Sequence, residues 1–282
     1  MTTGENSVDS GSGRLELSLG TFNIRYGSAD DKEDSWENRK QILVHCIAEM
    51  APDVLSVQEA LPFQIDVIKQ SLPRLDRFGL GRFHGFPTDR AHEAFSGEHC
   101  DILYDTNKLG LLKWGTFWHS ETPDVPASRS WGNSLPRITT WGILRDRTTG
   151  VDFAVVNTHL HWDEPYVSKA TTLLAGTIRD LAGDYPVILT GDFNATPESA
   201  LYRALTTELA LRDSWVVTGG TEESMGTSHR FEGIPRRRID WIMVGSDIGV
   251  ESAQRILYEE DGRYPSDHYP VLASLRVYPP AL

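Results

Sequence analysis

The sequence predicts an α/β fold made of two similar halves whose sheets pack face to face. Short apolar runs alternate with helical patterns along the chain, which is typical of α/β proteins. The stretches APDVLSVQEALP (51–62) and GDYPVILTGDFNATP (183–197) each follow a predicted helix and contain a short turn, a buried strand, a terminal carboxylate and a proline able to open the next helix. Because ligands of α/β proteins commonly sit beyond the carboxyl ends of strands, Glu59 and Asp192 should open onto one cleft.

The remaining elements follow from apolar periodicity. A helix over 36–50 has one apolar face that includes Leu43, Ile47 and Met50, and Ser35 is placed to cap it. Further helices are expected over 62–72 and 166–182 and near 198–207. Strands are expected over 15–24, 53–58, 100–104, 111–117, 138–146, 151–158, 187–190, 239–244 and 270–277.

Composition limits the class of protein. The 282 residues are 39% hydrophobic, which is enough for a sizeable core, and the formal charge is −13. Affinity for nucleic acid comes mostly from Lys and Arg that neutralise phosphates, so this charge favours a small substrate, although a local basic patch can still bind a polyanion. Residues 1–13 are rich in Ser, Gly and Thr, predict a disordered tail and lack the apolar core of a secretory signal.

The cysteines and the apolar runs indicate a cytoplasmic protein. Cys46 and Cys100 make neither a disulfide framework nor a zinc-type spacing, which favours a reducing compartment. No run approaches the roughly 18 apolar residues that span a membrane, so we expect no membrane partner. The sequence carries no signature of an oligomeric state.

Two polar pairs adjoin predicted strands. Asp192 and Asn194 follow the apolar run VILT two positions apart, so both can point into one pocket, or they can form a plain Asx-type turn. Asp267 and His268, in SDHYP, precede the last strand. There the histidine can face a substrate while the aspartate contacts a metal or a second histidine, and a purely structural turn is the alternative.

Four single positions add to these pairs. His159, in NTHL, ends a predicted strand, where a lone histidine is more often structural. Glu59 and Asn23 also end strands, and a buried carboxylate needs a cation or a strong hydrogen-bond donor facing it. Asp240 lies between apolar residues in RIDWI and suits an orienting partner for a histidine. Each position alone is ambiguous, but so many such groups at strand ends are not expected by chance.

In their chain order, the motifs TFNIR, QE, NTHL, GDFN, RIDWI and SDHYP resemble the endonuclease/exonuclease/phosphatase family. This magnesium-dependent superfamily includes pancreatic-type deoxyribonucleases, apurinic endonucleases, inositol-phosphate phosphatases, sphingomyelinases and deadenylases. The stretches SWENRK, TFWHSETPDVP, SLPRITTW and GRYPSDHYPV are similar to bacterial members of mostly unassigned substrate. The resemblance spans residues 17–277 and implies a four-layer α/β sandwich, two packed mixed sheets flanked by helices in a deoxyribonuclease-like single domain over 14–282.

The resemblance also implies Mg²⁺ as cofactor, with Mn²⁺ as a substitute. Glu59 resembles the principal metal-binding glutamate, and Asn23 and Asp267 resemble the groups that complete the metal environment. Such oxygen ligands suit Mg²⁺, which polarises phosphoryl oxygens and neutralises charge on a leaving oxygen.

Five residues resemble the catalytic groups of the family. Asp192 resembles the aspartate that orients or activates the attacking water, and Asn194 the residue that holds a phosphate oxygen. His268, oriented by Asp240, resembles the histidine that stabilises charge at phosphorus. His159 resembles a second histidine near the phosphate or the leaving group.

The chain departs from its close relatives at two places. His161 and Trp162 stand after NTHL, where relatives carry Asp and a further polar residue, and a His-Cys-Asp run over 99–101 replaces small or apolar residues. A transition-metal site at that run is disfavoured because adjacent residues in a strand face opposite ways.

Substrate recognition has several candidate groups, because Arg suits phosphate and Trp suits a sugar or base face. For each alone, packing or a surface ion pair is the alternative, as it is for the loop 119–137 and for the run of arginines over 236–238. The candidates are Arg25, Trp36, Asn38, Arg39, Trp131, Arg137, His161, Trp162 and His229.

Three functions remain open. The first is a phosphatase or phosphodiesterase acting on a small phosphorylated metabolite. The second is a DNA or RNA nuclease, whose cleavage would depend steeply on salt. The third is a family member with altered, non-hydrolytic chemistry or a binding role only, which the complete set of motif residues disfavours.

Overall fold

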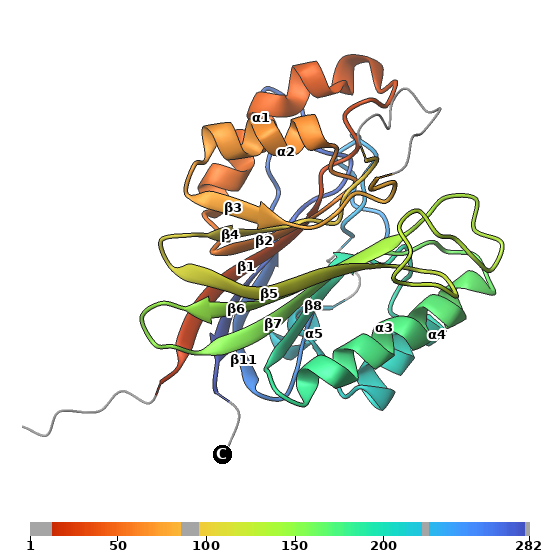
Figure 1. Ribbon diagram of the computed structural model, residues 1–282. Helices are drawn as coiled ribbons and strands as arrows, with labels where there is room; N and C mark the ends of the chain where they lie inside the picture. Colours follow the sequence, from red (N-terminus) through yellow and green to blue (C-terminus); the bar gives the residue numbers. More distant parts are fainter. Residues whose placement is uncertain (1–12, 86–95, 222–225, 280–282) are drawn as a thin grey trace, which may run out of the picture.

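Two six-stranded sheets pack face to face in the computed structural model, which describes residues 13–85, 96–221 and 226–279 (Figure 1). The first sheet has the order β11-β12-β1-β2-β4-β3 and the second has the order β5-β6-β7-β8-β10-β9. Helices α1 and α2 cover the outer face of the first sheet, and α3 and α4 cover that of the second (Figure 1). The predicted four-layer sandwich is therefore confirmed, whereas the predicted tail lies almost wholly outside the described residues.

The elements alternate along the chain as the apolar pattern indicates. The strands are β1 (Leu15–Asn23), β2 (Val54–Gln58), β3 (Leu75–Phe78), β4 (Ile102–Asp105), β5 (Leu109–Trp118), β6 (Ile138–Asp146), β7 (Asp152–His159), β8 (Val187–Asp192), β9 (Arg212–Asp213), β10 (Asp240–Val244), β11 (Ile248–Arg255) and β12 (Val271–Val277). The helical segments are η1 (Lys32–Asp34), α1 (Trp36–Met50), α2 (Pro62–Ser71), α3 (Tyr166–Ala182), α4 (Ala200–Arg203), the π-helical η3 (Ala204–Glu208) and α5 (Ser214–Val217).

The two halves repeat one β-α-β unit. Strands β1 and β2 are parallel and joined through α1, and β7 and β8 are parallel and joined through α3. The other strand pairs are antiparallel, so both sheets are mixed. In both units the parallel strands bring their carboxyl ends to the same edge, which confirms the predicted similarity of the halves.

The space between the sheets is apolar over most of its area and polar near one edge. Leu17, Phe153 and Ile188 belong to the buried cluster that both sheets share. Nearer the edge, the Gln58 Nε2 donates to Asn157 Oδ1 at 2.7 Å, and the Asn157 Nδ2 donates to the Val57 carbonyl at 2.9 Å. These buried hydrogen bonds join the sheets directly behind the strand ends and fix the relative position of the groups that follow.

Three local features differ from the sequence expectation. Ser35 precedes α1 but its side chain makes no capping hydrogen bond. The helix expected near 198–207 is short and continues into a π-helical turn. Strands β3, β9 and β11 and the short helix α5 were not expected, because β3, β9 and α5 have at most four residues and β11 is an edge strand with one fully buried residue, Ile248. Within the described residues, no helix is long and apolar enough to cross a membrane.

Candidate active site

The predicted catalytic groups meet at one edge of the sandwich. Asn23 ends β1, and His159 and Asp192 end the neighbouring strands β7 and β8, where the two residues pair in register. Because β10 runs antiparallel to β8, its first residue, Asp240, lies opposite Asp192. Strand β12 is antiparallel to β1, so the segment before it, with His268, reaches the same edge.

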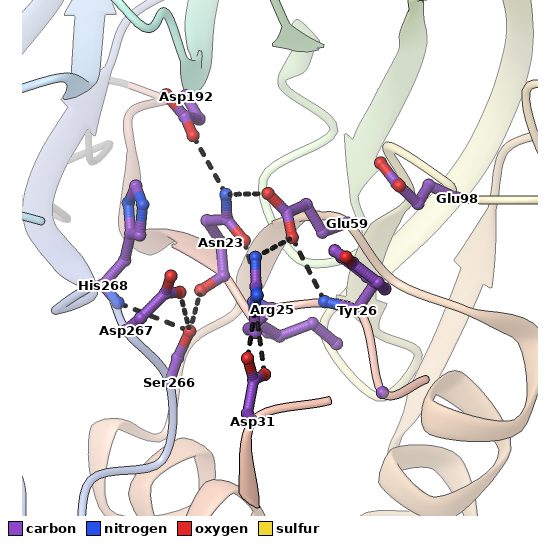
Figure 2. A network of polar contacts seen from close by, with 12 residues as sticks. Asn23, Arg25, Tyr26, Asp31, Glu59, Glu98, Asp192, Ser266, Asp267 and His268 are labelled. Atoms are coloured by element: carbon purple, nitrogen blue, oxygen red, sulfur yellow. Dashed lines mark hydrogen bonds and ion pairs between the residues drawn. The ribbon is translucent and has the colours of Figure 1, made fainter. Parts of the chain in front are cut away.

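The side-chain amide of Asn23 joins the two halves of the site. Its Nδ2 donates to Glu59 Oε1 at 3.1 Å and to Asp192 Oδ2 at 2.9 Å, across 169 residues of sequence (Figure 2). Its Oδ1 accepts from the backbone N–H of Arg25 at 3.0 Å, which fixes the orientation of the amide. The Asn23 amide therefore places the Glu59 and Asp192 carboxylates side by side.

Glu59 follows β2 in a left-handed backbone conformation, with φ of 58°. Its Oε2 accepts from the Tyr26 N–H at 3.2 Å and lies 4.0 Å from Arg25 Nη1. The Arg25 guanidinium is itself held by Asp31 at 2.8 Å (Figure 2). The donor that a carboxylate at this strand end requires is thus present, and the carboxylate still faces the edge of the sandwich.

Asp192 is 2% exposed and has no cation bonded to it among the described residues. Burial, and next the Asp240 carboxylate, raises the pKa of Asp192 to about 7. The preceding Gly191 has φ of 154°, and a Cβ there would lie 2.2 Å from the Thr158 carbonyl oxygen. Only glycine lets β8 approach β7 this closely, and that approach brings Asp192 beside His159.

His159 and Asn194 form a pair next to Asp192. His159 Nε2 lies 3.6 Å from Asp192 Oδ2 and 3.1 Å from Asn194 Nδ2. The Asn194 amide also donates to the Leu160 carbonyl at 3.0 Å, so this amide orients the histidine ring. Burial, followed by the charge of Arg137, holds the pKa of His159 well below its ordinary value, which keeps the ring neutral.

His268 carries the opposite charge state. Although burial alone would lower its pKa, Asp240 raises it well above the ordinary value, and Nδ1 lies 2.9 Å from Asp240 Oδ2. Asp240 Oδ1 is buried and has no hydrogen-bond partner among the described residues. The backbone N–H of Asp240 donates to Thr227 Oγ1 at 3.2 Å. His268 is therefore an imidazolium with Nε2 available to a substrate.

The donor set at this edge fits a hard divalent cation. Carboxylate oxygens of Asp192 and Asp240 lie within 4.8 Å of each other, and Glu59 and Asp267 add two further carboxylates. Burial raises the pKa of Asp267, as it does for Asp192, because nearby cations do not compensate fully for desolvation. The orphaned Asp240 Oδ1 points to the same shortage of positive charge, which a divalent cation would supply.

Three of the residues predicted to contact a substrate are buried and pack instead. Arg39 is 1% exposed, and its guanidinium donates to the carbonyls of Ile24, Arg25, Asp34 and Pro265; burial lowers its pKa to about 10. Trp36, 4% exposed, packs edge-on against Phe63. His229 is fully buried, with its ring stacked 4.0 Å from that of Tyr269. These side chains support the loops of the site from behind.

Of the other candidates, Arg137 lies beside the groups of the site and the aromatic residues pack on one another. Arg137 lines a small cavity together with Glu59 and His159, and its Nε and Nη1 are buried without hydrogen-bond partners among the described residues. His161 stacks on Trp162, with ring centroids 4.2 Å apart. Trp131, from the irregular loop 119–137, packs against Tyr166 at 6.4 Å. Their substrate contacts stay predictions.

The His-Cys-Asp run is a hydrogen-bonded network. His99 Nδ1 lies 3.0 Å from Asp101 Oδ1, and Arg77 Nη1 lies 3.0 Å from Asp101 Oδ2. Cys100 is a buried free cysteine that belongs to a small apolar cluster with Trp118. The Asp101 carboxylate therefore already has a cation partner in Arg77.

A cavity of about 650 Å³ adjoins the catalytic edge, and the sequence did not predict it in full. It is bounded by Asp267, His268 and Asn194, by Trp162 and Ile239, and by the segment 228–237. Arg230 belongs to this wall but lies in an irregular loop with no motif. Among the arginines of the predicted run, Arg236 and Arg237 line the cavity.

The chain is similar to known proteins in both sequence and fold. The model of the Endonuclease/Exonuclease/phosphatase family matches residues 20–268, so the chain belongs to that family. A family protein from Bacteroides thetaiotaomicron superposes with a TM-score of 0.82 at 30% identity, over 94% of this chain and 98% of that one. A mannosyl-6-phosphatase of Bacteroides thetaiotaomicron superposes with a TM-score of 0.81 at 29% identity, over 92% and 99%.

Curated relatives are longer than the matched region. An uncharacterized mimivirus protein is 29% identical over 60% of this chain, and Drosophila melanogaster Nocturnin is 25% identical over 68%. The match spans 63% and 29% of the lengths of these two proteins. Members of the family thus include proteins named as phosphatases and as exoribonucleases.

Proposed function

We propose that this protein is a Mg²⁺-dependent hydrolase of phosphate ester bonds that acts as a phosphatase or phosphodiesterase on a small metabolite. The observation that carries the proposal is the Asn23 amide, which bonds Glu59 and Asp192 at 3.1 and 2.9 Å in front of the charged Asp240–His268 pair. The site combines carboxylates that can bind a metal ion with the fixed positive charge of His268. A metal ion and a positive charge both stabilise the negative charge of a reacting phosphoryl group.

The carboxylates form the metal-binding part of the site. Glu59 and Asp267 would hold Mg²⁺, and the Asn23 amide, whose Nδ2 donates to Glu59 and Asp192, would complete the metal environment by fixing these carboxylates. Bound there, the ion supplies Lewis-acid polarisation of phosphoryl oxygens and charge neutralisation at the leaving oxygen. Asn23 and Arg25 keep the Glu59 carboxylate turned toward the site.

Asp192 acts as the base that orients and deprotonates the attacking water. The carboxylate is buried at the edge where the two sheets meet and lies beside His159, where it can accept a proton from a bound water. The backbone N–H of Asn194 donates to Oδ1 at 2.9 Å and Asn23 donates to Oδ2, so both oxygens have fixed directions. A water bound to this carboxylate is held in one orientation toward the phosphorus.

His268 and His159 contribute in different charge states. The His268 imidazolium, held by Asp240, stabilises negative charge on a non-bridging phosphoryl oxygen through Nε2. The neutral His159, oriented by Asn194, lies on the other side of Asp192 and contacts the phosphate or the leaving group. The charged His268 and the neutral His159 thus lie next to the same Asp192 carboxylate. His268 can donate a proton toward the substrate, whereas His159 can accept one.

Two observations support a small substrate. The chain has a formal charge of −13, which repels a long polyanion at a distance. A solved structure that aligns over 92% of this chain is a mannosyl-6-phosphatase, and it shares 29% sequence identity. A sugar phosphate is therefore the first substrate class to test.

The experiment is a panel of phosphate mono- and diesters assayed with Mg²⁺, Mn²⁺ or EDTA beside plasmid and oligonucleotide substrates. We expect turnover of at least one small ester, its loss in EDTA, and a fall of about 10³-fold or more in kcat for His268→Ala with unchanged circular dichroism. The matched control is His84→Gln, at an exposed position outside the site. Cleavage of nucleic acid alone, steeply reduced by salt, would replace the proposal with a nuclease.

A further inference from the structure

The cavity next to His268 contains cationic side chains that the proposed hydrolysis does not use. Its volume of about 650 Å³ lies within the range of small-molecule binding sites. His268 and Asn194 form one part of its wall, and Arg230, Arg236 and Arg237 form another. A molecule that places a phosphoryl group at His268 therefore extends toward these arginines.

The arginines of this region differ in their ion pairs. Arg236 Nη2 contacts Glu232 at 2.5 Å, and the buried Arg238 contacts Asp213 at 2.7 Å. Arg230 and Arg237 are exposed, and within the described part of the chain neither forms a salt bridge. Two guanidinium groups without a carboxylate partner among the described residues, both beside one cavity, leave their N–H donors available to an anion bound there.

Hydrogen bonds hold both arginine-bearing segments against the catalytic residues. The Arg230 N–H donates to the Asp267 carbonyl at 3.0 Å, with a left-handed φ of 53°. The Arg237 carbonyl accepts from the Thr227 N–H at 2.9 Å, and Thr227 Oγ1 accepts from the Asp240 N–H. The backbone positions of the arginines are thus fixed relative to Asp240 and Asp267.

We propose that Arg230 and Arg237 bind a second anionic group of the substrate, so that the protein acts on small molecules with two phosphate or similar groups. This inference rests on the proposed function, because it assumes that the first phosphoryl group reacts at His268. Guanidinium groups bind phosphate through two parallel N–H donors. Trp162, 62% exposed on the cavity wall and stacked on His161, provides a flat face for the ring that connects the two groups.

The test compares matched ligands that differ in one phosphate. Fructose 1,6-bisphosphate is compared with fructose 6-phosphate, and adenosine 3′,5′-bisphosphate with adenosine 5′-monophosphate, by titration calorimetry of the full chain in Mg²⁺. Phosphate release is assayed in the same samples. In at least one pair the bisphosphate should bind about tenfold more tightly, which corresponds to one charge-assisted hydrogen-bonded contact. The two pairs distinguish a sugar from a nucleoside scaffold.

The variants Arg230→Gln and Arg237→Gln should each reduce the affinity ratio of bisphosphate to monophosphate to about threefold or less. Arg179→Gln, at an exposed arginine on α3 outside the cavity, should retain the ratio of the unmodified protein. Equal binding within both pairs, or a ratio that survives both substitutions, overturns the inference. Tight binding only of a single-stranded oligonucleotide also overturns it, in favour of a nucleic-acid channel.

The two proposals fail separately in this design. Phosphate release without any preference for bisphosphates supports the hydrolase and overturns the second-anion site. A preference that depends on Arg230 and Arg237, without turnover of these ligands or of any ester in the mono- and diester panel, supports the anion site and contradicts the hydrolase.

Discussion

Asp240 holds His268 across the junction of the two sheets, with Oδ2 2.9 Å from Nδ1. Asp240 begins β10 of the second sheet, and His268 precedes β12 of the first. This hydrogen-bonded ion pair therefore couples the packing of the sheets to the charge of the His268 ring. Any displacement of one sheet relative to the other changes this contact.

Asp240→Asn should lower kcat by about 10²-fold to 10⁴-fold, because an amide no longer stabilises the imidazolium of His268. The pKa of His268, followed by NMR, should fall toward its ordinary value. Since the two residues act as a unit, adding Asp240→Asn to His268→Ala should cost little further activity. Fully additive losses would show that Asp240 acts by another route.

Mg²⁺ should raise the melting temperature of the protein, because a ligand that binds only the folded state stabilises it by mass action. At 100 times its dissociation constant the gain is about 2.7 kcal/mol, or several degrees for a chain of this size. Glu59→Gln should reduce this shift, while Glu208→Gln, at an exposed position far from the site, should not. An equal shift in both variants would remove Glu59 from the metal environment.

Gly191→Ala should destabilise the protein by about 3 kcal/mol and reduce activity with it, because the new Cβ would lie 2.2 Å from the Thr158 carbonyl oxygen. The clash separates β7 from β8 at the residues next to His159 and Asp192. The matched control is Gly176→Ala inside α3, where a Cβ meets nothing within 4 Å. That variant should gain about 0.5–1 kcal/mol in urea unfolding. Equal effects of the two substitutions would contradict the close approach of the strands.

His119 should make the free energy of unfolding depend on pH. Burial lowers the pKa of His119 to about 3, and the ring is held by Tyr166 and Thr139. In the unfolded chain His119 takes up a proton near pH 6.5, whereas in the folded chain it stays neutral down to about pH 3. The contribution of this histidine to the free energy of unfolding is therefore fully present above pH 6.5 and is lost as the pH falls below that value. Between pH 7 and pH 5 this histidine accounts for a loss of about 2 kcal/mol.

His119→Gln keeps hydrogen-bonding atoms without titrating, so it should flatten the pH dependence by that amount in denaturant unfolding. His84→Gln, at an exposed position, serves as the control. An unchanged slope in the His119 variant would mean that the buried ring is protonated in the folded protein.

Long periodic segments and strand ends were predictable from the sequence. The helix over 36–50 was predicted with its observed bounds, since its apolar residues recur at helical spacing and pack on the first sheet. Strand β6 was also predicted with its observed bounds. Strand β11 was missed because it lies at the edge of its sheet and only its first residue is fully buried. Its sequence therefore lacks the alternation of apolar and polar residues that predicts a strand.

The convergence of the site was predictable, but its pairings were not. Carboxylates and amides at the carboxyl ends of strands must lie at one edge, so Glu59 and Asp192 were expected to share a cleft. That both would accept hydrogen bonds from the Asn23 amide depends on the distance between the sheets, which no local pattern encodes. The burial of Arg39 could not be predicted for the same reason, because one of its carbonyl partners, Pro265, lies 226 residues further along the chain.

The position of β1 between β12 and β2 has a consequence for folding during synthesis on the ribosome. Ribosomes deliver β1 early, while its antiparallel neighbour β12 emerges only with residues 271–277. Until then one side of β1 has no strand to pair with, and an open edge invites contact with other chains. Nascent chains that stall before β12 should therefore lack the completed site and be the species that most needs protection from aggregation.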